Sequence, residues 1–211
     1  MKPLIGHVIA KAGQLPVYNA QAYEYVMGAN GVFIRSEREN LAAMIPVAPA
    51  IEPIRGLSRL ETTVDIPKKV PEAILQRVLA ESIAAANIKP EPLEKLFHIL
   101  FYDDDWHLVI PAQIQKRDEV KPVESGPDSS YAKAMIEVHS HQVMPAYFSP
   151  QDDLDEQGFR IYCVIGDFWA PVPEIRVRIG IHGHRWEIPA SLVFEMPESI
   201  SGGMEVTNES S

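Results

Sequence analysis

Cysteine is almost missing from this chain, because Cys163 is the only one among its 211 residues. A single thiol excludes an intramolecular disulfide and a zinc cluster built from thiolates. Its neighbours in Arg160-Ile-Tyr-Cys-Val-Ile165 are strand-like and apolar, which favours a buried, inert thiol over a reactive one. Because no disulfide framework exists, a reducing cytoplasm is the expected compartment.

Long apolar runs are also missing. No stretch approaches the roughly 20 apolar residues that a membrane-spanning helix requires. The first residues, MKPLIGHVIAKAG, contain neither a long apolar core nor a small-residue cleavage site, so they do not resemble a secretory signal. We therefore expect a cytoplasmic protein that has no membrane partner.

Positive charge is scarce, since 19 basic residues face 29 acidic ones and the formal net charge is −10. No overall basic field exists to hold a phosphate backbone, so nucleic acid is not expected as a partner. Hydrophobic residues make up 46% and charged residues 23% of the chain. This balance is typical of a folded globular protein and not of a disordered one.

Residues 1–68 form an N-terminal extension of short strands and turns. Tyr23-Glu-Tyr-Val-Met27 and Val32-Phe-Ile-Arg35 flank Gly28-Ala-Asn-Gly31, a pattern that predicts a β-hairpin. The proline-rich segment Ile45-Pro-Val-Ala-Pro-Ala-Ile-Glu-Pro53 cannot form a regular helix, and an extended connection is expected there. No motif in this extension indicates a particular chemistry.

The main domain is expected at residues 69–198. Apolar residues recur at helical spacing after Pro71, which predicts a helix at about 71–87. For residues 93–111 we favour a β-hairpin with its turn at Asp103-Asp-Asp105, although Leu93, Leu96, Phe97 and Leu100 also fit a helical stripe. Periodicity alone does not decide between these two structures.

The remaining segments alternate between strands and polar connections. An exposed loop is expected at about 116–132, strands at about 133–141 and 159–166, and a hairpin at about 175–188. The polar residues 199–211 are expected to form a disordered tail. The fold class is therefore mixed α/β.

One stretch combines residue types that bind metals. His139 and His141 are two residues apart on a predicted strand, so both imidazoles point to the same face. Ser149-Pro150 is a strong helix start, which places Asp152 in the first helical turn, where it could point back at the histidines. Two imidazoles and one carboxylate leave a fourth tetrahedral position for water, as in a catalytic zinc site.

A simpler interpretation is a strand with two surface histidines, followed by a helix whose Asp152 only complements the helix dipole. The complete four-residue pattern, however, is expected by chance in roughly fewer than one such chain per thousand. The chain also has a second H-x-H, Ile181-His-Gly-His-Arg185, which no acidic residue follows at ligand spacing. Its central glycine predicts a hairpin turn and not a metal site.

The pattern H-S-H-x7-S-x2-D resembles the signature of the JAMM metallopeptidases, also called JAB or MPN-plus domains. This resemblance is strongest over residues 71–190. It implies a mixed sheet flanked by helices, with Zn²⁺ bound by His139, His141 and Asp152. It also implies that Ser149 helps to hold the oxyanion of the reaction. Within the family, the size of the chain and its M-P-A-aromatic-F-S segment resemble the bacterial branch called PRTRC system protein A.

The family takes its general base from a Glu that usually follows a helix and opens an apolar strand. Glu94, in Pro92-Leu-Glu94, matches this position, but Phe97 stands where the family usually has a glycine. A solvated carboxylate at a strand edge is the alternative interpretation of Glu94. Glu24 is the second candidate for the base. Glu137 shares a face with the histidines, and we interpret it as a partner that orients an imidazole.

The family cleaves peptide or isopeptide bonds at the C-terminal tails of ubiquitin-like proteins or at related tails. The resemblance therefore implies a zinc metallopeptidase or isopeptidase that acts on such a tail. An E1-like enzyme, encoded beside the named branch, is an expected partner. The alternative is a non-catalytic module that binds the tail as an extra strand on its sheet edge.

Overall fold

The computed structural model describes residues 2–11, 14–88, 91–142 and 144–203, and it shows a mixed α/β protein in which strands predominate. The chain divides into two compact units that interleave along the sequence. The first contains Met1–Pro67, Glu156–Phe159 and Ile179–Trp186, and the second contains Lys68–Asp155, Arg160–Arg178 and Glu187–Ser211. The short segments that return to the first unit are not signalled by the sequence.

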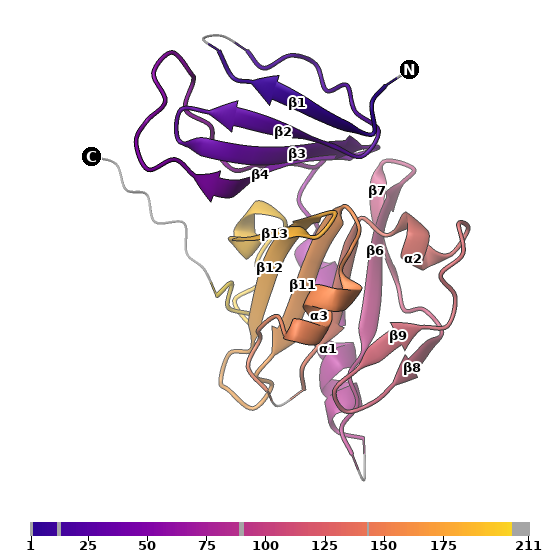
Figure 1. Ribbon diagram of the computed structural model, residues 1–211. Coiled ribbons are helices and arrows are strands. Elements are labelled where there is room, and N and C mark those ends of the chain that lie inside the picture. The colour runs from indigo at the N-terminus through magenta and orange to yellow at the C-terminus, as the bar shows by residue number, and fades with distance from the viewer. Residues whose placement is uncertain (1, 12–13, 89–90, 143, 204–211) are drawn as a thin grey trace. The chain divides into compact units, whose positions relative to one another are not determined.

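The first unit contains a five-stranded sheet in the order β1-β2-β3-β4-β5 (Figure 1). The predicted hairpin is confirmed: its turn lies at Ala29-Asn30, and Gly31, with a φ of 139°, begins the returning strand. A Cβ atom at Gly31 would lie 2.2 Å from the carbonyl oxygen of Ala48, so only glycine fits. The strands are β1 (Ile5–Ile9), β2 (Tyr23–Gly28), β3 (Gly31–Arg38), β4 (Leu41–Pro49) and β5 (Thr63–Asp65).

The proline-rich segment is not merely a connection, because β4 continues through Pro46 to Pro49 and pairs with β3. The register shifts between Val32 and Phe33, so that Phe33 lies opposite Pro46 and Val32 lies opposite Ala48. Proline lacks the N–H that a regular ladder needs, but it is tolerated at such an irregularity. The segment is extended and not helical, as expected, but residues 45–49 belong to a strand and not to a connection.

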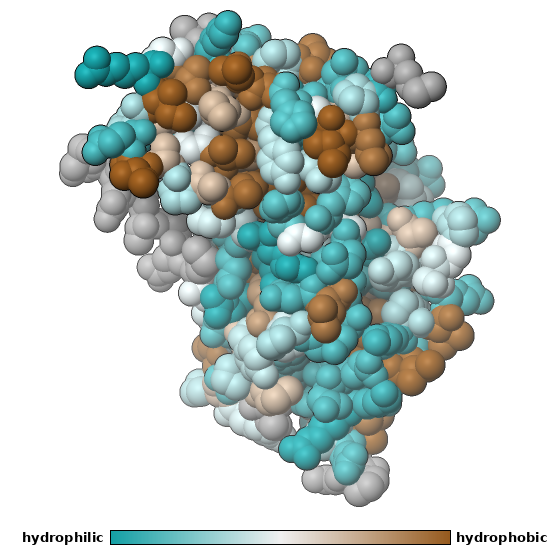
Figure 2. All heavy atoms as spheres, in the orientation of Figure 1, coloured by the Kyte–Doolittle hydropathy of each residue, from teal (hydrophilic) through white to brown (hydrophobic). Residues whose placement is uncertain are grey.

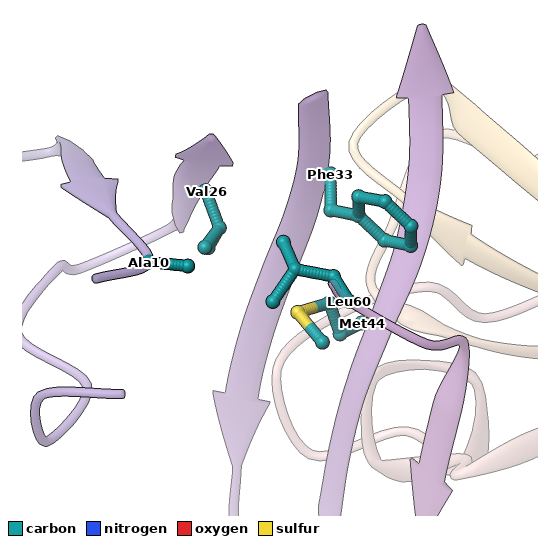
Figure 3. Close-up of a cluster of buried hydrophobic side chains, with 5 residues drawn as sticks. All are labelled: Ala10, Val26, Phe33, Met44 and Leu60. Atoms are coloured by element: carbon teal, nitrogen blue, oxygen red, sulfur yellow. The ribbon is translucent and has the colours of Figure 1, made fainter. Parts of the chain in front are cut away.

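A small apolar core stabilises the first unit. Val26, Phe33, Met44 and Leu60 pack together with Ala10 (Figure 3). Other large apolar side chains of this unit stay exposed, among them Ile9, Met27 and Val47. In Figure 2, brown residues gather over the part that Figure 1 draws as β1 to β4.

A six-stranded sheet has the order β13-β12-β11-β10-β6-β7. It belongs to the second unit except for the end of β12 and the first residues of β13, which fall within Ile179–Trp186 of the first unit. Strand β10 pairs in parallel with β11 and antiparallel with β6. Figure 1 shows α3 in front of this sheet and α1 behind it. The elements are α1 (Glu72–Ala86), β6 (Leu96–Tyr102), β7 (Asp105–Val109), β10 (Ile136–Ser140), α3 (Pro150–Asp155), β11 (Arg160–Gly166), β12 (Glu174–Ile181) and β13 (His184–Ile188).

The helix and the hairpin predicted for residues 71–111 are both confirmed. Helix α1 follows Pro71 and buries one stripe that includes Leu75 and Val78. Strands β6 and β7 pair antiparallel around Asp103-Asp104. All residues from Leu96 to Leu100 are buried, and such a strand, covered on both faces, shows no period of two. This explains why the sequence also fitted a helical stripe.

The expectation of an irregular loop at 116–132 was partly wrong. The segment contributes β9 (Val120–Pro122), which pairs with β8 (Gln113–Gln115), and a short helix α2 (Ser130–Lys133). The Oγ of Ser129 caps α2 by accepting a hydrogen bond from the N–H of Ala132. Three-residue strands are too short to carry a recognisable period, so the hairpin escaped prediction.

The expectation of a disordered tail at 199–211 was wrong for its first residues. Ile200 is buried, and the N–H of Ile175 donates to the carbonyl of Ser201, which ties this segment to β12. The rest of the predicted tail, residues 204–211, lies outside the described residues. Within the described ranges, every helix is too short or too polar to cross a membrane.

Candidate metal centre

Strand β10 and the residue after it present the two histidines of the H-S-H motif. β10 lies between β6 and β11, and the N–H of His141 continues the ladder by donating to the carbonyl of Ile165 at 2.8 Å. Both imidazoles are buried, with 8% of His139 and 3% of His141 exposed. A strand at the centre of the sheet therefore holds both rings on a rigid support.

Asp152 is held in place by a reciprocal pair of hydrogen bonds at the start of α3. The Oγ of Ser149 accepts from the N–H of Asp152 at 3.2 Å, and the Oδ2 of Asp152 accepts from the N–H of Ser149 at 2.6 Å. This is a capping box, with Pro150 at the first helical position and Asp in place of the usual Glu or Gln. The spacing S-x2-D follows from this local structure, which leaves Oδ1 of Asp152 for another partner.

The ligand atoms of the three residues converge. The Nε2 atom of His139 lies 3.2 Å from Nε2 of His141 and 3.3 Å from Oδ1 of Asp152. All three ligand atoms lie within 4.8 Å of one another, so His139, His141 and Asp152 could hold a metal ion. It is the sole group of this kind among the described residues.

The protonation of the histidines suits metal binding. Burial lowers the pKa of His139 to about 4 and also lowers the pKa of His141, so both rings are neutral near pH 7. Nδ1 of His141 lies 3.4 Å from the carbonyl oxygen of Pro145. A carbonyl can only accept, so Nδ1 carries the proton and Nε2 keeps its lone pair for a ligand bond.

Glu94 lies two residues before β6, the strand that pairs with β10. The antiparallel register pairs Leu96 with His139, and two more residues of the same register place Glu94 opposite His141. The N–H of Glu94 donates to the carbonyl of Lys116 at 2.9 Å, which helps to fix its backbone. The structure therefore brings Glu94 to the face that carries the two imidazoles.

The carboxylate of Glu94 is not a solvated group at a strand edge, because only 4% of the residue is exposed. Burial raises its pKa to about 8, and the nearby carboxylates of Asp152, Asp118 and Glu119 contribute to the rise. A buried carboxyl group whose pKa lies near neutral pH can both give up and accept a proton, which is the property that general acid–base catalysis requires.

Glu24, the second candidate for the base, belongs to the first unit and has structural partners. Its Oε2 forms a 2.6 Å ion pair with Arg35, and its Oε1 accepts from the N–H of Asn19 at 2.9 Å. Both members of the pair are buried. These contacts are those of a buried ion pair that stabilises the N-terminal sheet.

Replacing Glu24 with glutamine should therefore destabilise the first unit without changing the metal content. Breaking a buried ion pair costs about 3–5 kcal/mol, because the remaining charge stays buried without its partner. Denaturant unfolding and zinc analysis of the purified variant measure the two effects, with the exposed Glu39→Gln as control. A loss of turnover at unchanged stability would instead make Glu24 the catalytic base.

Glu137 lies on the histidine face, as expected, but its partners are different from those predicted. Its Oε2 accepts from Nη1 of Arg160 at 2.8 Å and lies 3.9 Å from Nε2 of His98. The idea that Glu137 orients a ligand imidazole is therefore wrong. The signal that was missed is Arg160, which β11 brings beside Glu137 from a distant part of the sequence.

The second H-x-H forms the tip of the β12–β13 hairpin, as the sequence predicted. His182 and Gly183 both have positive φ, at 47° and 91°. A tight turn directs the side chains of His182 and His184 differently from those of a strand, and they are not part of the metal-capable group. The glycine between the two histidines was the feature of the sequence that predicted this turn.

Gln142 is a residue of the site that the sequence did not indicate. It follows His141 with a φ of 48°, and its Nε2 donates to the carbonyl of Arg117 in the β8–β9 turn at 2.9 Å. Gln115 donates from its side chain to the carbonyl of Glu94 at 2.6 Å. The β8–β9 hairpin is thus bonded to both Glu94 and the segment after the second histidine.

A comparison with models of known protein families found no match to this chain, and a comparison with curated proteins found none either. The interpretation of the site therefore depends on the chain's own residues and their geometry.

Proposed function

We propose that this protein is a zinc-dependent metallopeptidase of the JAMM type, whose second unit has a JAB/MPN-like fold. One observation carries the proposal: one ligand atom each of His139, His141 and Asp152 lies within 4.8 Å of the other two, on the face that also carries the buried Glu94. The parallel pair β10–β11, connected through α3, supports the JAB/MPN-like arrangement, since it brings the H-S-H and S-x2-D parts together.

The donor set fits zinc better than magnesium or calcium. Two neutral imidazoles and one carboxylate are typical zinc ligands, whereas magnesium and calcium prefer oxygen donors. Three protein ligands leave a position open for water or substrate, which is typical of a catalytic zinc. When bound, zinc supplies Lewis-acid chemistry, in which it polarises a carbonyl group and makes water a stronger nucleophile near neutral pH.

Two further side chains have roles in the proposed hydrolysis. A cation held by the neighbouring ligands would lower the pKa of Glu94 from about 8 and favour its carboxylate. That carboxylate accepts the proton of the attacking water and passes it to the leaving nitrogen as the C–N bond breaks. The products are a carboxylate and an amine. The Oγ of Ser149 accepts a hydrogen bond from the N–H of Asp152. The hydroxyl proton of Ser149 is not used in this bond, so it can be donated to the developing oxyanion.

The proposed substrate is the C-terminal tail of a ubiquitin-like protein, joined through a peptide or an isopeptide bond. An E1-like enzyme is the proposed partner, and the cytoplasm is the proposed location. The H-S-H-x7-S-x2-D pattern supports this substrate class through its resemblance to the JAMM family.

Two measurements test the proposal. Elemental analysis of protein purified without added metal should find about one zinc per chain, as three ligands around an open position imply. A ubiquitin-like protein carrying a reporter at its C-terminus should be cleaved, and a chelator should stop the cleavage. Absence of zinc, together with retained binding of the uncleaved tail, would indicate the non-catalytic binding module instead.

Replacing Ser149 with alanine should lower kcat by about 10²–10³-fold, because one donor to the oxyanion is lost. Loss of the helix cap should also lower the free energy of unfolding by about 1 kcal/mol. Steady-state kinetics on zinc-loaded protein measure the first effect. Ser149→Thr keeps a hydroxyl and a capping oxygen and serves as the control, and equal rates for both variants would rule out the oxyanion role.

A further inference from the structure

Arg178 on β12 makes two contacts with the segment that carries Ser149 and Asp152. The centre of its guanidinium lies 3.9 Å from the centroid of the Phe148 ring, and its Nη1 donates to Oδ1 of Asp153 at 2.8 Å. Only 5% of Arg178 is exposed. This arginine therefore joins the sheet to the start of α3 from a buried position.

The two contacts flank the capping box. Phe148 directly precedes Ser149, and Asp153 directly follows Asp152. The capping box fixes Ser149 and Asp152 relative to each other, but these bonds do not fix either residue relative to the sheet that holds the histidines. Arg178 supplies such a link, because β12 belongs to the same sheet as β10.

We propose that Arg178 is a positioning residue: it holds the Phe148–Asp153 segment against the sheet and so keeps Oδ1 of Asp152 in reach of the histidines. The inference uses the metal site of the proposed function, but it does not require that the bound metal hydrolyses a peptide. A ligand carboxylate that can move away from the imidazoles binds the ion less tightly and donates less uniformly.

Arginine is suited to this role by its shape. A planar guanidinium can stack on an aromatic ring and donate from its edge to a carboxylate at the same time. An ammonium group is a point charge on a flexible stem and cannot reproduce both contacts in one fixed geometry. Arg178→Lys therefore preserves the charge and removes the positioning.

The charge of Arg178 alone would have the opposite effect on metal affinity. A positive group near the site repels a cation, and Arg178 contributes to lowering the pKa of His139 in this way. If charge were its only influence, Arg178→Gln should strengthen zinc binding. If Arg178 positions Asp152, both Arg178→Gln and Arg178→Lys should weaken it.

The test is zinc affinity, measured on the full chain by competition with a chelator of known affinity. Both Arg178 variants are expected to bind zinc about 10–100-fold more weakly, as is common when a residue that orients a ligand is lost. Phe148→Leu and Asp153→Ala each remove one contact and should give smaller losses in the same direction. The Asp153 side chain is half exposed, so its replacement should not impair folding. This variant therefore still tests the proposal if the Arg178 variants fold poorly.

Arg176 provides a matched control on the same strand, where its guanidinium pairs with Glu187 of β13. Arg176→Lys should leave the affinity unchanged. Unchanged or tighter binding in the Arg178 variants, with normal binding in the wild type, would reject the positioning role and leave the proposed function intact. If the wild-type protein binds no zinc, both proposals are overturned.

The electronic spectrum of the cobalt-substituted protein gives a second readout that depends on ligand geometry and not on turnover. Arg178→Lys is expected to change this spectrum, and Arg176→Lys is expected to leave it as in the wild type. The same spectrum for all three proteins would contradict the proposal.

Discussion

Glu94→Gln is expected to abolish peptide hydrolysis while zinc stays bound. Glutamine has almost the same shape as glutamate, but its amide cannot accept the proton of the attacking water. Loss of a general base lowers kcat by about 10²–10⁴-fold. Steady-state kinetics and zinc content, measured on the same preparation, separate the chemical step from metal binding.

Glu94→Gln is expected to fold at least as stably as the wild type, so a loss of activity would not result from unfolding. The pKa of Glu94 is raised to about 8 in the folded protein from the ordinary value of 4.5. Between these two pH values the unfolded chain loses this proton and the folded protein keeps it, so the free energy of unfolding falls as the pH rises. Glutamine never ionises and escapes this loss. The variant should therefore unfold at a temperature no lower than that of the wild type at pH 7.

The exposed Glu91, three residues earlier, provides the control. Glu91→Gln should keep full activity, full zinc content and the wild-type unfolding temperature. Full activity in Glu94→Gln would show that Glu94 is not the base, even if the protein is a zinc peptidase.

Replacing His139 with alanine is expected to remove both zinc and activity, because one of three protein ligands is lost. The loss of affinity should exceed the 10–100-fold change that is usual for residues that only orient a ligand. Asp152→Asn is a finer test, since asparagine keeps an oxygen for the N–H of Ser149 and loses the charge. It should weaken zinc binding while α3 keeps its cap.

The second H-x-H of the chain is the natural control for these ligand variants. His182→Ala and His184→Ala remove the same type of side chain from a motif of the same spacing, and both should keep zinc. Elemental analysis and the reporter cleavage assay apply to all four variants. Zinc retained in His139→Ala but lost in His182→Ala would move the metal site to the hairpin tip.

Sequence alone could predict the parts of the site whose geometry is local. The alternation of a strand places His139 and His141 on one face, and the capping box needs only the four residues from Ser149 to Asp152. The hairpin at 93–111 and helix α1 were also predictable, because breakers and apolar residues mark their ends. Each of these features depends on neighbours within one element.

The parts that escaped prediction depend on residues far apart in the chain. Arg178 contacts Phe148 and Asp153 from another strand of the sheet, and Gln142 bonds to a turn formed by Arg117. No local pattern distinguishes these residues from other polar side chains of a strand or a loop. The prolines of β4 were misjudged for a related reason, since a bulge opposite Val32 and Phe33 accommodates Pro46.

The antiparallel pairing of β6 and β10 determines whether the candidate base and the metal ligands come together. Glu94 and His141 can meet only if Leu96 lies opposite His139, because a slip of one residue would turn Glu94 to the other side of the sheet. A chain that folds with another register in this pair would therefore have a complete set of metal ligands on β10 and α3 but no carboxyl group of Glu94 beside it.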